Sequence, residues 1–228
     1  MTTSGTYAFN PSLGETMLYA YNLCGIRPTS LVQEHFEAAR MAANMLLSRW
    51  SNQGVNLWAV DLITVPLVQG TATYAVDPST VVMLDAYVDT QSGTEAISRI
   101  ILPISRTEYA SYPNKTQQGA VTTFWFDRLL SPTVTLWPVP DGTQPTMKYY
   151  RVRQIQDATL TGGQTVDIPY LWLEAFALAL GQRLALIWAP DRMGIIKPLA
   201  DEAYQIAADQ NIEVAQQYIS PMISGYYR

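Results

Sequence analysis

The side chains best suited to chemistry are a single histidine, His35, and a single cysteine, Cys24. A cysteine beside a histidine can act as a nucleophile, because the imidazole accepts the thiol proton. The two residues fall on neighbouring predicted helices, so such a pair is conceivable. However, Cys24 shares an apolar stripe of helical spacing with Met17 and Tyr21, where a buried thiol is ordinary packing. We therefore expect Cys24 and His35 to be structural.

Two pairs of acidic residues have the chemistry of a glycoside hydrolase, which places two carboxyl groups around one glycosidic bond. Glu34 and Glu37 lie near the start of a predicted helix, and Asp85 and Asp89 lie in a predicted strand. Neither pair belongs to a recognisable motif. A solvated helix turn and a solvated strand edge are the simpler interpretation of both, so we predict no catalytic residue.

The sequence contains no motif for a disulfide, a zinc site or a phosphate-binding loop. One cysteine cannot form an internal disulfide or a cysteine-rich zinc site. Gly162-Gly163 lacks the Lys and Ser/Thr that complete a P-loop, and it predicts a bend. Asp201 and Glu202 are expected in the first turn of the last helix, where negative charge complements the helix dipole. We expect no cofactor and no metal.

The composition indicates a folded chain with an unusual surface. Of 228 residues, 48% are hydrophobic and only 14% are charged, against about 25% charged in an average soluble domain. This deficit fits a surface covered by neighbouring subunits, although an uncharged polar surface explains it equally well. The net charge of −5 and the lack of a Lys/Arg cluster argue against an electrostatic grip on nucleic acid.

The first predicted elements are two antiparallel helices, over about 13–24 and 31–52. Ser12 with Glu15, and Ser30 with Gln33, have the spacing of capping boxes. The second helix carries an apolar stripe for packing against another helix, formed by Val32, Phe36, Ala39, Ala43, Leu46 and Trp50.

The middle of the chain changes to the alternating pattern of strands. Predicted strands cover 71–76, 81–88, 97–104, 121–126, 133–139 and 146–155. Ser105 with Glu108 predicts a short helix that ends before Pro113. We expect an antiparallel sheet built from hairpins.

The last region is predicted to be helical again. A helix over 170–189 is apolar nearly all round, but Glu174 and Arg183 interrupt it, so we expect a buried helix and no membrane span. Pro190 should end this helix and Pro198 should start another, reaching about Tyr218 with Leu199, Ala203, Ile206 and Val214 on its inner side.

These elements define an α+β fold in four segments. They are an N-terminal helix pair (1–56), an inserted antiparallel β region with one short helix (57–156), C-terminal helices that complete a helical bundle (157–219), and an extended tail (220–228). Tyr226 and Tyr227 lie in a tail too short to build a core, so we interpret them as interface anchors, a common role of tyrosine.

Several segments together resemble the head-to-tail adaptor proteins of short-tailed bacteriophages, also called tail accessory factors or packaged-DNA stabilisation proteins. Trp50 ends a helix before a turn, and Trp137-Pro138-Val139-Pro140-Asp141 closes an aromatic β segment. The resemblance runs in order through residues 47–55, 67–74, 125–141 and 167–175. The end of the first helix, Cys24–Arg27, is a loose version of the family pattern, and the last nine residues have no counterpart.

The resemblance implies a virion structural protein, assembled in the host cytoplasm and located at the head-tail junction. It implies a ring of twelve copies that joins the portal to the tail nozzle or tube, closes the head after packaging, and surrounds a channel through which DNA passes without specific binding. It also implies a portal-docking tail (Met222, Ile223, Tyr226, Tyr227 and Arg228) and a β region facing the tail (Trp125, Phe126 and Trp137).

Three alternatives stay open at this point. The chain could be a peptidoglycan hydrolase of the virion, a role suggested for some proteins that it resembles. It could also be a connector of a long-tailed phage, or a plug near the portal.

Overall fold

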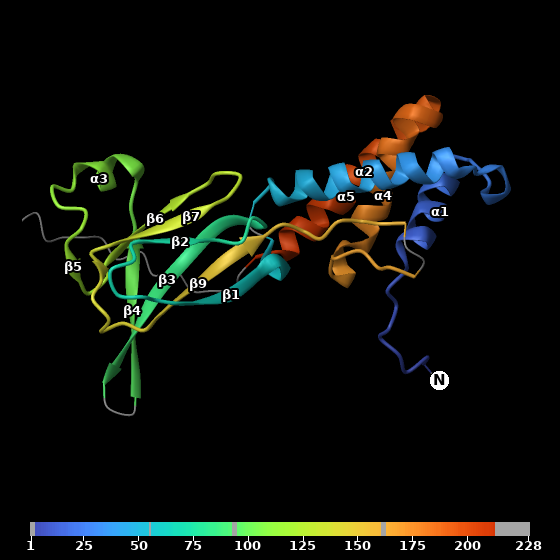
Figure 1. Ribbon diagram of the computed structural model, residues 1–228. Coiled ribbons are helices and arrows are strands. Elements are labelled where there is room, and N and C mark those ends of the chain that lie inside the picture. The colour runs from blue at the N-terminus through green and yellow to red at the C-terminus, as the bar shows by residue number, and fades with distance from the viewer. Residues whose placement is uncertain (1–2, 55, 93–94, 161–162, 213–228) are drawn as a thin grey trace, which may run out of the picture.

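A computed structural model describes residues 3–54, 56–92, 95–160 and 163–212. The chain forms a helical region and a β region that lie end to end (Figure 1). The helical region contains α1 (Leu13–Leu23), α2 (Gln33–Ser51), α4 (Leu173–Trp188) and α5 (Met193–Gln210), with 3-10 turns η1 (Pro28–Ser30), η3 (Tyr170–Trp172) and η4 (Pro190–Arg192). The β region is inserted between α2 and α4, so the predicted α+β class is confirmed.

The two N-terminal helices begin in different ways. α1 has the predicted capping box: Ser12 Oγ accepts a hydrogen bond from the Glu15 backbone N–H at 3.3 Å, and the Glu15 carboxylate accepts one from the Ser12 N–H at 2.8 Å. The box predicted at Ser30 is wrong, because Ser30 lies in the 3-10 turn η1. α2 begins at Gln33 instead, where the Val32 N–H donates to His35 Nδ1 at 3.3 Å.

The centre of the helical region is α4, as predicted. Phe176, Leu180 and Leu184 are fully buried, and α1, α2 and α5 all pack against this helix. α1 and α2 make few contacts with each other, so the predicted helix pair is not confirmed. The segment Tyr170–Trp188 is long and apolar enough to cross a membrane, but half of it is buried inside the protein.

α5 differs from the prediction at both ends. It begins at Met193 after the 3-10 turn η4, and Pro198 lies inside it rather than at its start. The predicted inner face is wrong in part: Ala203 packs against the helical core, but Leu199 and Ile206 are exposed. Ile196, Ala200 and Ala207 are buried in their place. The helix ends at Gln210, and Val214 and Tyr218 lie outside the described residues.

The β region is one curled seven-stranded sheet with the order β1-β9-β3-β4-β6-β7-β2. Its strands are β1 (Val60–Pro66), β2 (Thr73–Ala75), β3 (Thr80–Ser92), β4 (Glu95–Pro103), β6 (Thr123–Asp127), β7 (Thr133–Trp137) and β9 (Thr146–Arg153), and β1 follows a 3-10 turn, η2 (Leu57–Ala59). A separate two-stranded pairing joins β5 (Gln118–Gly119) to β8 (Val139–Pro140).

The prediction of a purely antiparallel sheet is wrong. β4 and β6 pair in parallel, with Leu102 opposite Thr123. Between them the short helix α3 (Arg106–Ser111) crosses over the sheet, and such a crossover returns the chain in the same direction. The predicted helix after Ser105 is confirmed, with Ser105 Oγ accepting from the Glu108 N–H at 3.1 Å.

Each region has its own cluster of buried residues, and side chains at the junction connect the two. The Asn44 carboxamide exchanges two hydrogen bonds with the Ala158 backbone, at 2.9 and 2.8 Å. Arg153 at the end of β9 pairs with Asp167 before α4. Within the sheet, Arg151 is buried and bonds Asp61 of β1 at 2.8 Å.

Candidate interaction surfaces

Cys24 and His35 have structural surroundings, as predicted. The buried Cys24 thiol donates a hydrogen bond to the Gly181 carbonyl at 3.5 Å, and burial raises its pKa, which the positive charge of Arg192 offsets in part. A raised thiol pKa opposes nucleophilic chemistry. The His35 ring stacks on Trp188, with ring centres 4.3 Å apart.

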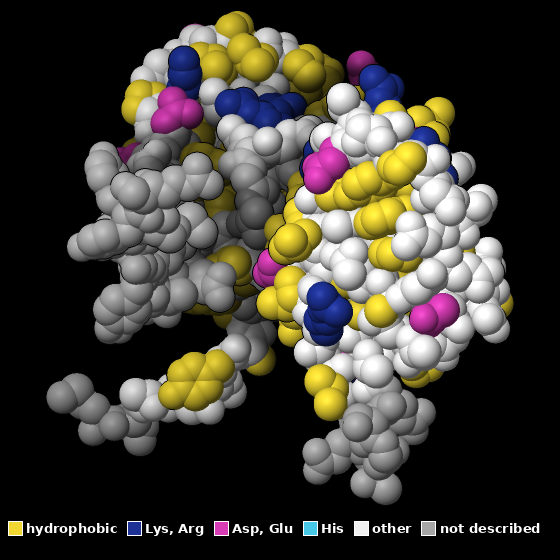
Figure 2. Space-filling model, turned by 90° about the vertical axis from the view of Figure 1, so that its left-hand side faces the viewer, with side chains coloured by type: hydrophobic (Ala, Val, Ile, Leu, Met, Phe, Trp, Pro, Cys, Tyr) yellow, Lys and Arg dark blue, Asp and Glu magenta, His cyan; other side chains and the backbone are white. Residues whose placement is uncertain are grey.

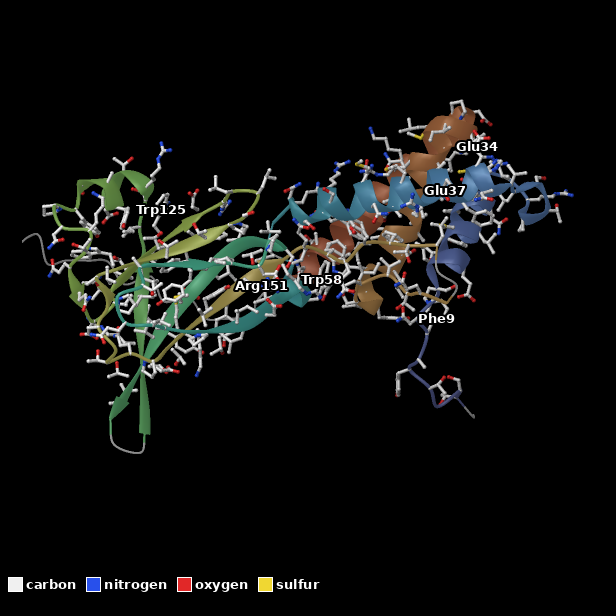
Figure 3. All side chains as sticks on the ribbon, viewed as in Figure 1. Phe9, Glu34, Glu37, Trp58, Trp125 and Arg151 are labelled. Carbon is white, nitrogen blue, oxygen red and sulfur yellow. The ribbon has the colours of Figure 1, made fainter. Side chains whose placement is uncertain are left out.

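Each acidic pair has a structural explanation. Glu34 and Glu37 are exposed at the end of α2 far from the β region (Figure 3), and Glu37 pairs with Arg40 at 3.1 Å. Asp85 is exposed and Asp89 is buried in the same strand. Four residues of extended strand span about 13 Å, which exceeds the separation of roughly 5–10 Å between glycosidase carboxylates.

The remaining candidate motifs are also explained by structure. Asp201 and Glu202 lie well inside α5, not in its first turn as predicted, because the helix begins at Met193. Gly163 has a φ of 78°, the left-handed conformation of a bend that glycine tolerates, while Gly162 lies outside the described residues. No group of three His, Cys, Asp or Glu side chains within the described ranges is placed to hold a metal ion.

Asp89 is instead part of a buried ion pair in the sheet. Its carboxylate accepts hydrogen bonds from Lys148 at 2.7 Å and Ser98 at 2.7 Å. The Lys148 hydrogen bond is the largest cause that holds the pKa of Asp89 below its usual value. The group therefore connects β3, β4 and β9.

This ion pair makes stability depend on pH. Because the Asp89 pKa is lower in the folded state, its stabilisation is present above the unfolded pKa of about 3.9 and is lost as pH falls through the folded value. We expect Asp89→Asn to lower the unfolding free energy at pH 7 by about 2 kcal/mol and to reduce its loss in acid. Urea unfolding measured from neutral to acidic pH tests this. Asp85→Asn, at an exposed carboxylate of the same strand, is the control and should change neither quantity.

The aromatic residues predicted to face the tail hold α3 on the sheet. The Trp125 ring stacks on Tyr109 with centres 5.5 Å apart, and Trp137 stacks on Tyr112 at 4.1 Å. The Trp137 indole N–H donates to the Asn114 carbonyl at 3.0 Å. Phe126 packs against the buried β cluster. These three residues are half-buried and lie at the end of the molecule away from the helices, where Trp125 is seen (Figure 3).

One face of the sheet carries exposed apolar residues that the sequence reasoning missed. Ile100 and Leu102 are 69% and 62% exposed, on the opposite side of β4 from the buried Ile101. Strand register places three further residues on the same face. The outer sheet face is thus defined by Leu62, Tyr87, Ile100, Leu102 and Tyr150.

A second apolar surface lies on the helical region. Ile195, Leu199 and Ile206 are exposed along α5 at helical spacing, and we call them the α5 stripe. The N-terminal segment before α1 extends away from the body (Figure 1), with Tyr7 fully exposed and Phe9 touching Tyr170. Surface apolar residues arranged in groups mark interaction sites more often than scattered ones do.

Charge is sparse on the surface that is visible at the end of the β region. In Figure 2 the described side chains there are mainly uncharged polar and hydrophobic, with separate Lys/Arg and Asp/Glu side chains among them. The predicted docking residues Met222, Ile223, Tyr226, Tyr227 and Arg228 lie outside the described residues, so their role stays a prediction.

An elongated α+β chain with two cores and grouped apolar residues on its surface is typical of a protein that contacts partners. The profile of the SU10 adaptor protein family matches residues 30–221. The chain therefore belongs to the SU10 adaptor protein family, a family of phage head-to-tail adaptors, as the resemblance implied. It is a component of the virion with a structural role. No curated protein matches the chain significantly.

Proposed function

We propose that this adaptor forms a closed ring, of twelve copies, between the portal and the tail nozzle or tube of a short-tailed phage. The observation that carries the proposal is family membership over residues 30–221. The ring closes the head after DNA packaging and surrounds the channel through which DNA leaves.

The exposed surfaces support ring formation. A closed ring requires heterologous contacts, in which one surface of each copy meets a different surface of the next. The outer sheet face and the α5 stripe are two such surfaces on separate regions of the chain. Each surface also carries charge: Lys148 lies opposite Tyr87 on the sheet face, and Glu202 lies between Leu199 and Ile206 on α5. Lys148 is already paired with Asp89, which lowers the cost of burying it between copies, because an unpaired charge is costly to bury.

The two ends of the molecule suggest an orientation. In this proposal the β region, with α3 held on Trp125 and Trp137, faces the tail protein. The segment 220–228 follows the helical region and docks on the portal. The net charge of −5 favours a channel wall that repels DNA phosphates and lets DNA slide. No observation favours the hydrolase, since Glu37 pairs with Arg40 and Asp89 pairs with Lys148.

Electron micrographs of the purified protein mixed with portal rings test the proposal. We expect one added ring of density on each portal, with the rotational symmetry of the portal. Ile195→Asp combined with Leu199→Asp should prevent the ring while leaving the fold intact, because both side chains are exposed. Thr73→Asp, at an exposed residue of the edge strand β2, is the matched control. A chain that stays monomeric on portals would contradict the proposal.

A further inference from the structure

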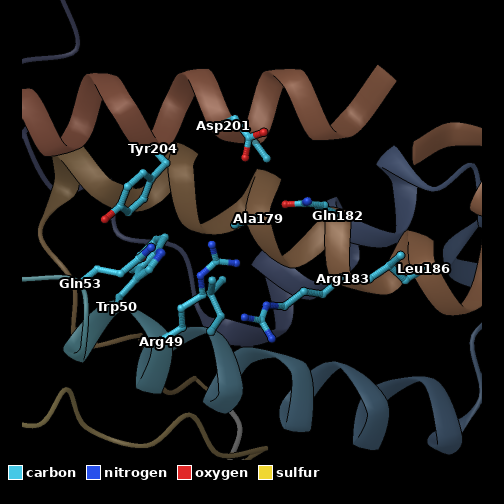
Figure 4. A pocket seen from close by; sticks show the side chains of 11 residues that line it. Arg49, Trp50, Gln53, Ala179, Gln182, Arg183, Leu186, Asp201 and Tyr204 are labelled. Carbon is cyan, nitrogen blue, oxygen red and sulfur yellow. The ribbon is translucent and has the colours of Figure 1, made fainter. Parts of the chain in front are cut away.

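A cleft of about 310 Å³ opens between α2, α4 and α5, away from both apolar surfaces described above (Figure 4). Its apolar lining includes Trp50 and Ala179. The polar lining comes from all three helices and from the turn after α2, and consists of Arg49, Gln53, Gln182, Arg183, Asp201 and Tyr204. Except for Gln53, the polar groups of the cleft stand on helices, which keeps them in fixed positions.

Two guanidinium groups enter this cleft from different helices. Arg49 comes from α2 and Arg183 from α4, and Figure 4 shows both reaching into the space between these helices. Within the described ranges, neither forms an ion pair or a hydrogen bond with the protein. Burial, together with the positive charge of Arg49, lowers the pKa of Arg183. The half-buried Arg183 is therefore held close to a like charge, that of the exposed Arg49.

The lining offers mainly hydrogen-bond donors. Each guanidinium presents a fork of N–H groups, the Gln53 and Gln182 carboxamides have N–H groups to donate, and Tyr204 has a hydroxyl. A single carboxylate is matched by one guanidinium fork, whereas a tetrahedral phosphate has enough oxygens to accept from two. An anion between Arg49 and Arg183 also replaces their repulsion with two attractions. From this arrangement we infer that the cleft is a binding site for a phosphate group.

Asp201 limits the affinity of the cleft for phosphate. It is the one acidic residue in the lining, on α5, so the two guanidinium groups and this carboxylate give a net charge of +1. The carboxylate repels a bound phosphate. This predicts that removing its charge strengthens binding, which is opposite to the effect of removing either arginine.

Titration calorimetry of the full chain with inorganic phosphate, at neutral pH and low ionic strength, tests the site. We expect Arg49→Gln and Arg183→Gln each to weaken phosphate binding about tenfold, the loss of about 1.4 kcal/mol from one charge-assisted contact. Asp201→Asn should strengthen it about threefold. Arg128→Gln removes the same charge from an exposed position of the β region and should have no effect. Circular dichroism confirms that each variant is folded.

The source of the phosphate is distinguished by a second titration with short double-stranded DNA. DNA that displaces inorganic phosphate, and binds more weakly to the two arginine variants, identifies a backbone phosphate as the ligand. Phosphate binding without competition from DNA identifies a free phosphate compound. Acetate that binds as tightly as phosphate would overturn the assignment in favour of a protein carboxylate. Phosphate binding that is unchanged in the Arg49→Gln/Arg183→Gln double variant would overturn the site itself.

Discussion

Replacement of Trp50 by alanine is expected to lower the free energy of unfolding of the helical region by about 3–5 kcal/mol, the usual cost of truncating a large buried aromatic residue. Trp50 is 3% exposed. Its ring lies 5.1 Å from Trp172, 6.0 Å from Phe176 and 5.9 Å from Tyr204, measured between ring centres. One substitution therefore removes contacts that α2 makes with η3, α4 and α5 at once.

Urea unfolding followed by helical circular dichroism measures this loss. Tyr19→Ala is the matched control, since Tyr19 is an aromatic residue of α1 that is 52% exposed, and surface substitutions usually change stability by no more than about 0.5 kcal/mol. A loss below about 1 kcal/mol for Trp50→Ala would show that the cluster does not hold the helices together.

The same cluster connects the two regions. Trp58, just before β1, lies with its ring centre 4.9 Å from that of Trp172, and Asn44 and Arg153 add polar contacts at the junction. The cavity left by Trp50→Ala is thus close to the start of the sheet. We expect the β signal to unfold together with the helical signal if these contacts couple the two cores.

Local sequence patterns predicted the elements that are fixed by hydrogen bonds between residues close together in the sequence. Ser12 and Glu15 bond to each other's backbone, so their spacing alone was sufficient to place the start of α1. Pro198 was misleading because a preceding turn, begun by Pro190, had already started the helix. A proline in the second turn then costs one hydrogen bond with Gly194, a cost that packing of Ile196 and Ala200 against α4 can offset.

Tertiary arrangement was less predictable. β1 (Val60–Pro66) was missed as a strand because its residue types do not alternate as its exposure does: the apolar Leu62 lies on the exposed face, and the strand ends in a proline. The parallel pairing of β4 with β6 depends on where α3 returns the chain, which no short pattern encodes. The run Ile100-Ile101-Leu102 did carry a signal, since consecutive apolar residues in a strand place apolar groups on both faces of a sheet.

The candidate surfaces, too, depend on tertiary packing that local sequence patterns do not show. The sequence contains Arg49 and Arg183 at positions far apart, and only the packing of α2 against α4 brings them into one cleft. Leu199 and Ile206 have the spacing of a core stripe, yet they face solvent, because α5 also carries small residues that allow closer packing on its other side. Exposure of an apolar stripe is therefore a property of the fold, and it is what suggests a partner.

Deletion of residues 220–228 is expected to abolish stable attachment to the portal while leaving the fold intact. Among the described residues, the buried members of both clusters end at Ala207, before the deleted segment. Tyr226 and Tyr227 are the proposed anchors. In a ring, each copy contributes one weak contact, and linked contacts can raise the overall affinity by about 10²–10⁴. Losing every contact together should therefore have a much larger effect than the affinity of one tail suggests.

Co-sedimentation of the truncated protein with portal rings measures the attachment, and circular dichroism checks the fold. A full-length variant with Tyr226→Ser and Tyr227→Ser keeps the length of the tail and should attach much more weakly than the natural chain. Thr2→Ala at the other end of the chain is a control that should attach normally. Normal attachment of the truncated protein would show that the portal contact lies elsewhere. The α5 stripe would then be the next surface to test, because it is an exposed apolar surface of the helical region.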